Sequence, residues 1–154
     1  MESCVRKIHF SYGHRVMNHE SKCASLHGHN GVVWVYARPI NGLDSLGRVV
    51  DFSVLKEKLG GWIDSNWDHT MILSKDDTSV INAVQGTWQK RPAFLLPNNP
   101  TAENMAKYLL YEICPIVLKG KGIVVHKIGF FETENSYVEE SIDSFDDSLL
   151  NKYR

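Results

Sequence analysis

Residues 23–29 read Cys-Ala-Ser-Leu-His-Gly-His, and the rest of the chain is organised around them. In extended backbone, alternation puts His27 and His29 on one face of a strand. Cys23 lies four residues before His27, close enough to reach the same site. Upstream, His14 in the stretch 10–15 supplies a third candidate imidazole. Three neutral imidazoles with one open coordination position are typical of a catalytic zinc site rather than a structural one.

The composition is that of one ordinary globular domain, which we expect to span residues 1–154. The chain is 43% hydrophobic and 23% charged, both usual values for a soluble protein. Its net charge of −1 gives no electrostatic reason to expect nucleic acid or a membrane surface as a partner. No apolar run is long enough to span a membrane, and residues 1–7 lack the apolar segment of a signal peptide. Three cysteines without paired spacing fit a reducing, cytoplasmic compartment.

Alternating apolar residues and a run rich in Val, Trp and Tyr predict a sheet. The first predicted strand ends near residue 11, so that His14 falls where the strand gives way to a loop. In the last strand, even-numbered residues from 124 to 132 share one face. The predicted strands are residues 5–11, 29–38, 48–51 and 123–133, with a hairpin loop at 39–47.

Two helices complete the core. The first is capped by Asp51 or Ser53 and ends near Asn66, with two adjacent glycines, 60 and 61, weakening its centre. The second is capped by Thr101 and should end or kink at Pro115. The order of strands, helix, helix and strand predicts an α+β fold, an antiparallel sheet with both helices on one face. Such a sheet has open edges, through which the protein could associate with copies of itself.

Two segments are less regular. Residues 74–99 are predicted to hold a short helix at 80–84 and a short strand at 94–96, with loop between them. A loop of this length in a compact domain is either functional or hides a missed element. The acidic tail, 138–154, is weakly patterned, and we expect it to be partly mobile.

Each candidate site residue also has a simpler explanation. An H-x-H pair alone arises by chance, and His14 could be an ordinary surface residue; the third histidine and nearby cysteine favour a metal. Cys23 could be a proton acceptor or nucleophile, a fourth zinc ligand, or inert. We interpret Cys4 and Cys114 as inert.

Two further features could carry chemistry. In Asp68-His69, the carboxylate could orient the imidazole as a proton relay, or the pair could simply pack at a helix end. Glu132 lies beside Phe130 and Phe131, where a carboxylate needs a partner or a ligand. It could accept paired hydrogen bonds from a guanine- or pterin-like edge, or it could sit in water at a sheet edge.

Taken together, these pieces resemble the 6-pyruvoyl-tetrahydropterin synthase superfamily. No single piece is specific, but the combination is, and the pieces run in the family's order across most of the chain. The matching stretches are residues 10–15, 23–30, 50–55, 68–69, 100–104 and 131–135.

The resemblance implies a role for each candidate residue. It implies that His14, His27 and His29 hold Zn²⁺ and that Cys23 is the catalytic proton acceptor. Asp68 with His69 would be the partner relay. The pterin-binding residues would be Glu132, which anchors the ring, and Thr101 with Glu103 near the pocket.

The resemblance also implies an architecture. It is the tunnelling fold, a four-stranded antiparallel sheet with two helices, assembled as trimers or as dimers of trimers forming a homohexamer. A neighbouring subunit could then supply the relay of Asp68 and His69. The 74–99 insert is longer than in compact bacterial members, which bears on substrate access and subunit contacts.

The spacing C-x-x-x-H-G-H is similar to that of the 6-carboxy-5,6,7,8-tetrahydropterin synthases of the queuosine pathway. This resemblance implies a zinc-dependent lyase that converts 7,8-dihydroneopterin triphosphate to 6-carboxy-5,6,7,8-tetrahydropterin, acetaldehyde and triphosphate. Two alternatives stay open: a synthase that makes 6-pyruvoyl-tetrahydropterin, and a zinc-stabilised pterin-binding module without catalysis.

Overall fold

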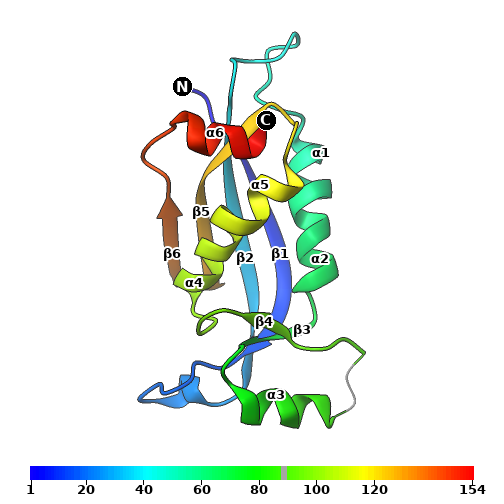
Figure 1. Ribbon diagram of the computed structural model, residues 1–154, viewed down its shortest axis with the longest axis vertical. Coiled ribbons are helices and arrows are strands. Elements are labelled where there is room, and N and C mark those ends of the chain that lie inside the picture. Colours follow the sequence, from blue (N-terminus) through cyan, green and yellow to red (C-terminus); the bar gives the residue numbers. More distant parts are fainter. Residues whose placement is uncertain (88–89) are drawn as a thin grey trace.

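The structure, a computed structural model, describes residues 1–87 and 90–154. Its strands form one six-stranded sheet in the order β4-β3-β1-β2-β5-β6 (Figure 1). Neighbouring strands among β1, β2, β5 and β6 pair antiparallel, whereas β3 pairs parallel to both β1 and β4. The expectation of four antiparallel strands is therefore wrong, although the α+β class holds. The strands are β1 (Cys4–His14), β2 (His27–Pro39), β3 (Thr70–Ser74), β4 (Phe94–Leu96), β5 (Ile123–Thr133) and β6 (Ser136–Ser141).

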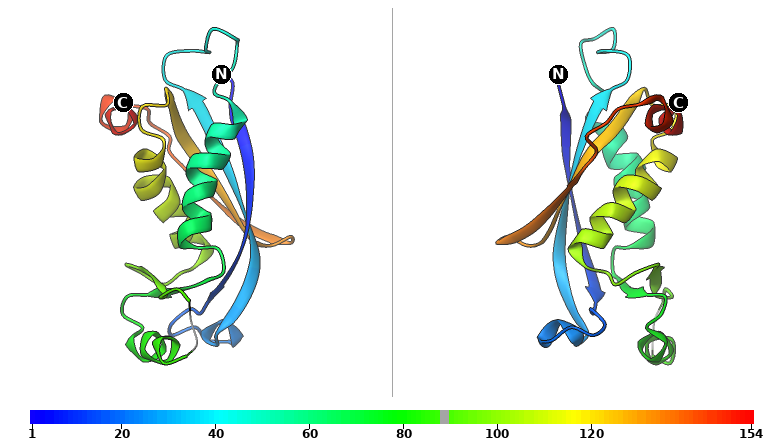
Figure 2. Two further views of the ribbon diagram at one scale, coloured as in Figure 1. Left: turned by 90° about the vertical axis from the view of Figure 1, so that its right-hand side faces the viewer. Right: turned by 60° about the vertical axis from the view of Figure 1, so that its left-hand side comes forward.

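Both long helices cover the same face of the sheet, as predicted (Figure 2). In each, a π-helical stretch joins two α-helical pieces. Asp51 caps the first helix through the Ser53 N–H, and Thr101 caps the second through the Asn104 N–H. The first runs through α1 (Phe52–Leu55), η2 (Lys56–Gly60) and α2 (Gly61–Asn66), and the second through α4 (Ala102–Tyr108), η3 (Leu109–Ile113) and α5 (Cys114–Val117).

Alternation in β1 and β2 separates the helix-covered face from the open face. The buried residues of β1 from Ile8 onward are the even-numbered ones, and they continue to His14 at the strand's end. In β2 the odd-numbered residues face the same core. In β5, a bulge at His126 opposite the Tyr36–Ala37 step reverses the alternation. Residues 128, 130 and 132 keep the predicted face, but 124 and 126 do not.

Two local predictions fail for identifiable reasons. Residues 48–51 form no strand, because Asp44 accepts hydrogen bonds from the backbone N–H and the guanidinium of Arg48 and closes this segment on itself. The prediction that Pro115 ends or kinks the second helix fails in its first alternative, because the helix continues to Val117. Pro115 follows the π-helical stretch η3 and occupies the first turn of α5, where its missing N–H is tolerated.

The chain between the two helices contains more regular structure than the sequence suggested. His69 takes a positive φ of 55°, a conformation that turns the chain from α2 into β3. The strand β3 was not predicted from the sequence. The predicted short helix and strand are confirmed as α3 (Thr78–Gln85) and β4. Residues 88–89 of the 74–99 insert lie outside the described residues.

The acidic tail is ordered, contrary to expectation. β6 pairs with β5 through a tight connection in which Thr133 faces Ser136. After it, α6 (Asp147–Tyr153) is capped by Asp146 and buries Tyr153 completely in the core. A strand and a helix thus form where the sequence pattern is weak, because both gain their stability from packing on β5 and α5.

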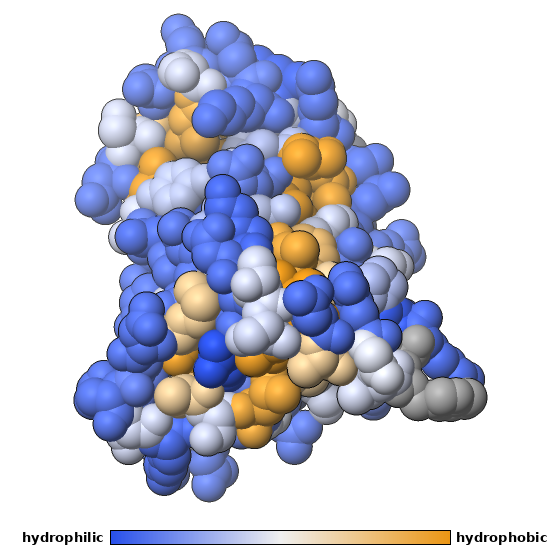
Figure 3. Space-filling model, turned by 60° about the horizontal axis from the view of Figure 1, so that its bottom comes forward, coloured by the Kyte–Doolittle hydropathy of each residue, from blue (hydrophilic) through white to orange (hydrophobic). Residues whose placement is uncertain are grey.

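Figure 3 turns the lower end of Figure 1 toward the viewer and shows apolar surface broken into patches between hydrophilic side chains. None of the helices formed by residues 1–87 and 90–154 is long and apolar enough to cross a bilayer.

Replacing Gly31 should test the packing beneath the site. A Cβ there would lie 2.9 Å from the Tyr12 ring and 3.1 Å from the Phe10 ring, so the aromatic cluster must shift. We expect Gly31→Ala to lower the free energy of unfolding by about 1–3 kcal/mol in urea titrations. Gly61→Ala is the matched control, because its Cβ meets nothing within 4 Å in a helical backbone; it should raise stability by about 1 kcal/mol. Equal effects of the two substitutions would contradict this packing.

Candidate metal centre

Three imidazoles meet where β1 ends and β2 begins, at the lower end of the sheet in Figure 1. The antiparallel register sets His14 opposite His27 and Tyr12 opposite His29. Because β1 runs on to His14 instead of ending near residue 11, all three histidines lie on the face that the helices cover. Their ring centroids are 4.6–5.0 Å apart.

The second nitrogen of two rings is already fixed by backbone carbonyls. His14 Nδ1 donates to the Pro100 carbonyl at 2.7 Å, and His27 Nδ1 donates to the Ser25 carbonyl at 2.7 Å. These bonds leave each Nε2 as a lone-pair donor, the arrangement usual for metal-bound histidine.

The described residues leave this cluster unsatisfied. Among residues 1–87 and 90–154, the buried Nε2 atoms of His14 and His29 have no hydrogen-bond partner. One ring nitrogen from each of the three histidines lies within 4.8 Å of the others. Buried polar atoms are normally paired, so converging orphan nitrogens fit a metal ion.

Burial sets the charge state of these rings. It lowers the pKa of His14 to about 4, with the neighbouring imidazoles acting in the same direction. Burial also lowers the pKa of His29, again with a contribution from His27. At neutral pH both rings are therefore neutral, which is the form that binds a metal.

Glu132 reaches the cluster from the end of β5. Its carboxylate oxygens lie 3.8 Å from His14 Nε2 and 3.9 Å from His29 Nε2. Burial raises the pKa of Glu132; the nearby Glu103 adds to the rise, and His27 opposes it. The carboxylate faces the site rather than open water, so it is available to a ligand.

Cys23 borders the same cavity, of about 270 Å³, as His14, Glu132, Thr101 and Glu103. It lies on the short 3-10 turn η1 (Lys22–Ala24) and is half-buried. Its sulfur is not part of the cluster of metal-ligating atoms, an arrangement that favours a free thiol over a fourth ligand. Cys4 and Cys114 are buried away from this cavity.

Asp68 and His69 form a pair but do not line this cavity. His69 Nδ1 lies 3.0 Å from the Asp68 carboxylate, and the His69 side chain is 80% exposed. Although burial opposes it, hydrogen bonds from the Ser11 N–H and from His69 lower the pKa of Asp68. The pair lies on the outer edge of β1 beside Ser11, available to a neighbouring molecule.

Sequence reasoning missed one residue that packs against the histidine cluster and two that line the cavity. The buried Tyr12 ring packs on His14 and His29, with centroids at 5.1 and 5.6 Å. Burial, with the charge of Glu132 nearby, raises the pKa of its phenol. Tyr137 and Val138 line the cavity from β6. Tyr12 could have been predicted, because it is two residues before His14 and therefore on the same face of β1. No local signal marked β6 as part of the site.

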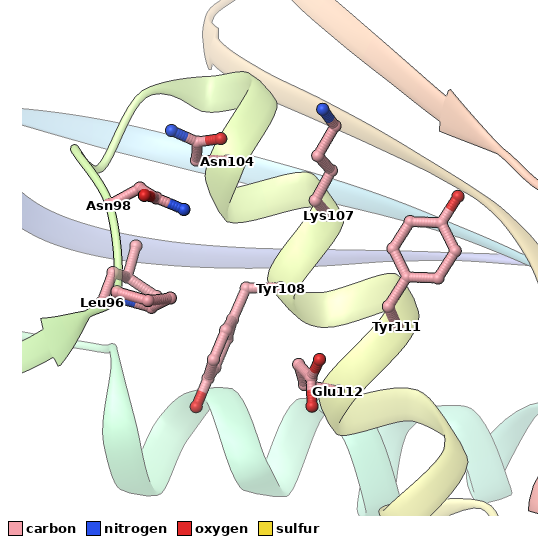
Figure 4. Close-up of a pocket in the computed structure, with 8 residues that line it drawn as sticks. Leu96, Asn98, Asn104, Lys107, Tyr108, Tyr111 and Glu112 are labelled. Carbon is pink, nitrogen blue, oxygen red and sulfur yellow. The ribbon is translucent and has the colours of Figure 1, made fainter.

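Two other hollows lie nearby. One, of about 670 Å³, is lined by His29 and Glu132 together with open-face residues such as Trp34 and Phe131. Figure 4 shows the other, of about 380 Å³, where Tyr108 and Glu112 point toward the α1–α2 helix. The second hollow contains no candidate metal ligand, so it is not part of the metal centre.

Comparison with known proteins agrees with this geometry. The profile of the 6-pyruvoyl tetrahydropterin synthase family matches residues 3–143, nearly the whole chain. The chain belongs to this family.

Some curated relatives are similar along almost their full length. The 6-carboxy-5,6,7,8-tetrahydropterin synthase of Rickettsia felis is 41% identical over 140 residues, covering 90% of this chain and 99% of the relative. A probable 6-carboxy-5,6,7,8-tetrahydropterin synthase of Halobacterium salinarum is 31% identical, covering 78% of this chain and 77% of the relative.

Solved structures share the fold at lower identity. An uncharacterized protein from Wolinella succinogenes superposes with a TM-score of 0.77 at 24% identity, covering 92% of this chain and 98% of its own. The 6-pyruvoyl tetrahydropterin synthase of Caenorhabditis elegans gives 0.65 at 24% identity, covering 92% and 96%.

Metal addition should stabilise this synthase-family chain through the three histidines. We expect Zn²⁺ to raise the midpoint of thermal unfolding of the metal-free protein. At free metal about 1,000 times the Kd, the gain is about 4 kcal/mol. His29→Ala should remove most of it, whereas His9→Ala, an exposed histidine in β1, should keep it. An undiminished shift in His29→Ala would contradict the assignment.

Proposed function

We propose that this protein is a zinc-dependent 6-carboxy-5,6,7,8-tetrahydropterin synthase. With one molecule of water, it would convert 7,8-dihydroneopterin triphosphate to 6-carboxy-5,6,7,8-tetrahydropterin, acetaldehyde and triphosphate, a carbon–carbon and carbon–oxygen lyase reaction in the queuosine pathway. The observation that carries the proposal is one cavity holding His14, Cys23 and Glu132. Similarity to curated relatives with this name, over 99% of their length in R. felis, supports the 6-carboxy product over 6-pyruvoyl-tetrahydropterin.

His14, His27 and His29 would hold Zn²⁺, leaving a position open to substrate. The bound metal would supply Lewis-acid polarisation of the substrate's side-chain oxygens. The chain's own contribution is the placement of the ligands. The carbonyls of Pro100 and Ser25 orient two of the imidazoles, and Tyr12 packs against two.

Glu132 would anchor the pterin ring. A carboxylate accepts two parallel hydrogen bonds from the 2-amino and N3 edge of such a ring, as it does from a guanidinium. Thr101 and Glu103, in the first turn of α4, border the same cavity and would contact the substrate. Because Glu132 also borders the open-face hollow beside Trp34 and Phe131, the flat ring can approach from that side.

Cys23 would accept and return protons at the substrate side chain. Asp68 and His69 would complete the transfers. Since they face outward in the isolated chain, we infer that they act in the site of a neighbouring copy. That arrangement requires a homo-oligomer. We propose a trimer, or a homohexamer built from two trimers, that acts in the cytoplasm on a soluble pterin triphosphate.

The product of zinc-loaded protein with 7,8-dihydroneopterin triphosphate, identified by mass spectrometry, tests the proposal. A 6-carboxytetrahydropterin with acetaldehyde is expected. A 6-pyruvoyl product would overturn the assigned reaction, and unchanged substrate with intact pterin binding would indicate a binding module.

Cys23→Ala should separate metal binding from turnover. We expect the variant to retain zinc by metal analysis and to lose turnover by about 100-fold or more, the usual contribution of a proton-transfer group. Cys4→Ala serves as the control, since Cys4 lies outside the cavity. Loss of zinc from Cys23→Ala would make this cysteine a ligand instead.

Glu132→Gln should weaken pterin binding without releasing zinc. Losing a charged acceptor of paired hydrogen bonds costs about 1.5–3 kcal/mol, measured as the Kd for the 6-carboxy product by calorimetry. Glu57→Gln, an exposed glutamate in η2, should bind as wild type does. Unchanged affinity in Glu132→Gln would exclude the ring-anchoring role.

A further inference from the structure

The segment 74–99 contacts the cysteine-bearing turn through one buried ion pair. Arg15, next to His14, donates from Nε and from Nη2 to the two carboxylate oxygens of Asp77, each at 2.6 Å. The Asp77 side chain is only 2% exposed. The hydrogen bonds that Arg15 donates to Asp77 raise the pKa of Arg15. Paired bonds of this kind fix both position and orientation.

Asp77 pairs with Arg15 instead of capping α3 with its side chain. It occupies the N-cap position of α3, yet its side chain accepts no hydrogen bond from the helix. An aspartate at that position normally accepts from a backbone N–H of the first turn, a contact worth about 1 kcal/mol. Both of its oxygens are instead directed to Arg15, so the start of α3 is built around that contact.

The third nitrogen of the guanidinium contacts the turn that carries Cys23. Arg15 Nη1 donates to the Ala24 carbonyl at 3.2 Å, immediately after Cys23. The N–H of Val16, the residue after Arg15, donates to the Cys23 carbonyl at 2.9 Å. One residue beyond Ala24, the Ser25 carbonyl orients the ring of His27. The guanidinium thus joins Asp77 to the backbone between the thiol and a metal ligand.

We propose that Asp77 is a positioning residue for Cys23 and acts through Arg15. The 74–99 segment then has a function: it delivers a carboxylate that holds Arg15 against the Ala24 carbonyl and so keeps the thiol in the metal cavity. This inference rests on the proposed function only for the consequence on turnover; the position of the thiol can be measured without substrate.

Alkylation of Cys23 by iodoacetamide measures that position directly. With zinc-loaded protein, the modified cysteine is identified by peptide mass mapping, and Cys4 and Cys114 are buried. We expect Asp77→Asn to increase the rate at Cys23 by about tenfold, because a turn released from the cavity opens locally to solvent. Zinc content should stay unchanged. If turnover is present in wild type, kcat should fall by up to about 100-fold with a smaller change in KM, since misplacement acts on geometry.

Two further variants complete the test, one at the other partner of the ion pair and one control at an exposed ion pair. Arg15→Lys retains the charge opposite Asp77, and hence the fold, but cannot reach both Asp77 and the Ala24 carbonyl; it should raise alkylation like Asp77→Asn. Asp44→Asn is the matched control, since it breaks an exposed pair with Arg48 and should change neither rate.

Three results would overturn the positioning role. They are wild-type alkylation rates in both Asp77→Asn and Arg15→Lys, loss of zinc from Arg15→Lys, or equal increases in the Asp44→Asn control. A wild-type protein without turnover would contradict the proposed function but leave the alkylation comparison valid.

Discussion

The site depends on the register between β1 and β2. In an antiparallel pair, a shift of one residue turns every side chain of a strand to the opposite face. The observed register sets His14 opposite His27, with His29 two residues further on the same face. That face is also the one on which Val33 and Val35 are fully buried. The hydrophobic core that fixes the register therefore also fixes which face carries the three histidines.

The candidate site residues lie on two kinds of element, long paired strands and a short turn. The imidazoles lie on long paired strands and are oriented by carbonyls, whereas Cys23 lies on a short turn held by side chains. Burial keeps His14 neutral and raises the pKa of Glu132 in the same space. The neutral imidazoles suit a bound cation, because burial disfavours the protonated rings that could not bind it.

Patterns of local origin could be predicted from the sequence. The common face of His27 and His29 and the long strands follow from alternation, and the caps at Asp51 and Thr101 follow from residue type. Features decided by distant partners could not. β3 is a short apolar run whose parallel pairing depends on β1, and the bulge at His126 appears only when β5 meets β2. The placement of Asp77 beside Arg15 spans 62 positions and leaves no local trace.

The proposed zinc centre has three imidazole ligands, an open position and a free Cys23 beside it. X-ray absorption at the zinc edge of the zinc-loaded protein can test this set of ligands. We predict three nitrogen ligands at about 2.0–2.1 Å with a light atom in the fourth position. A sulfur ligand at about 2.3 Å would place Cys23 on the metal and contradict the division between ligands and proton acceptor.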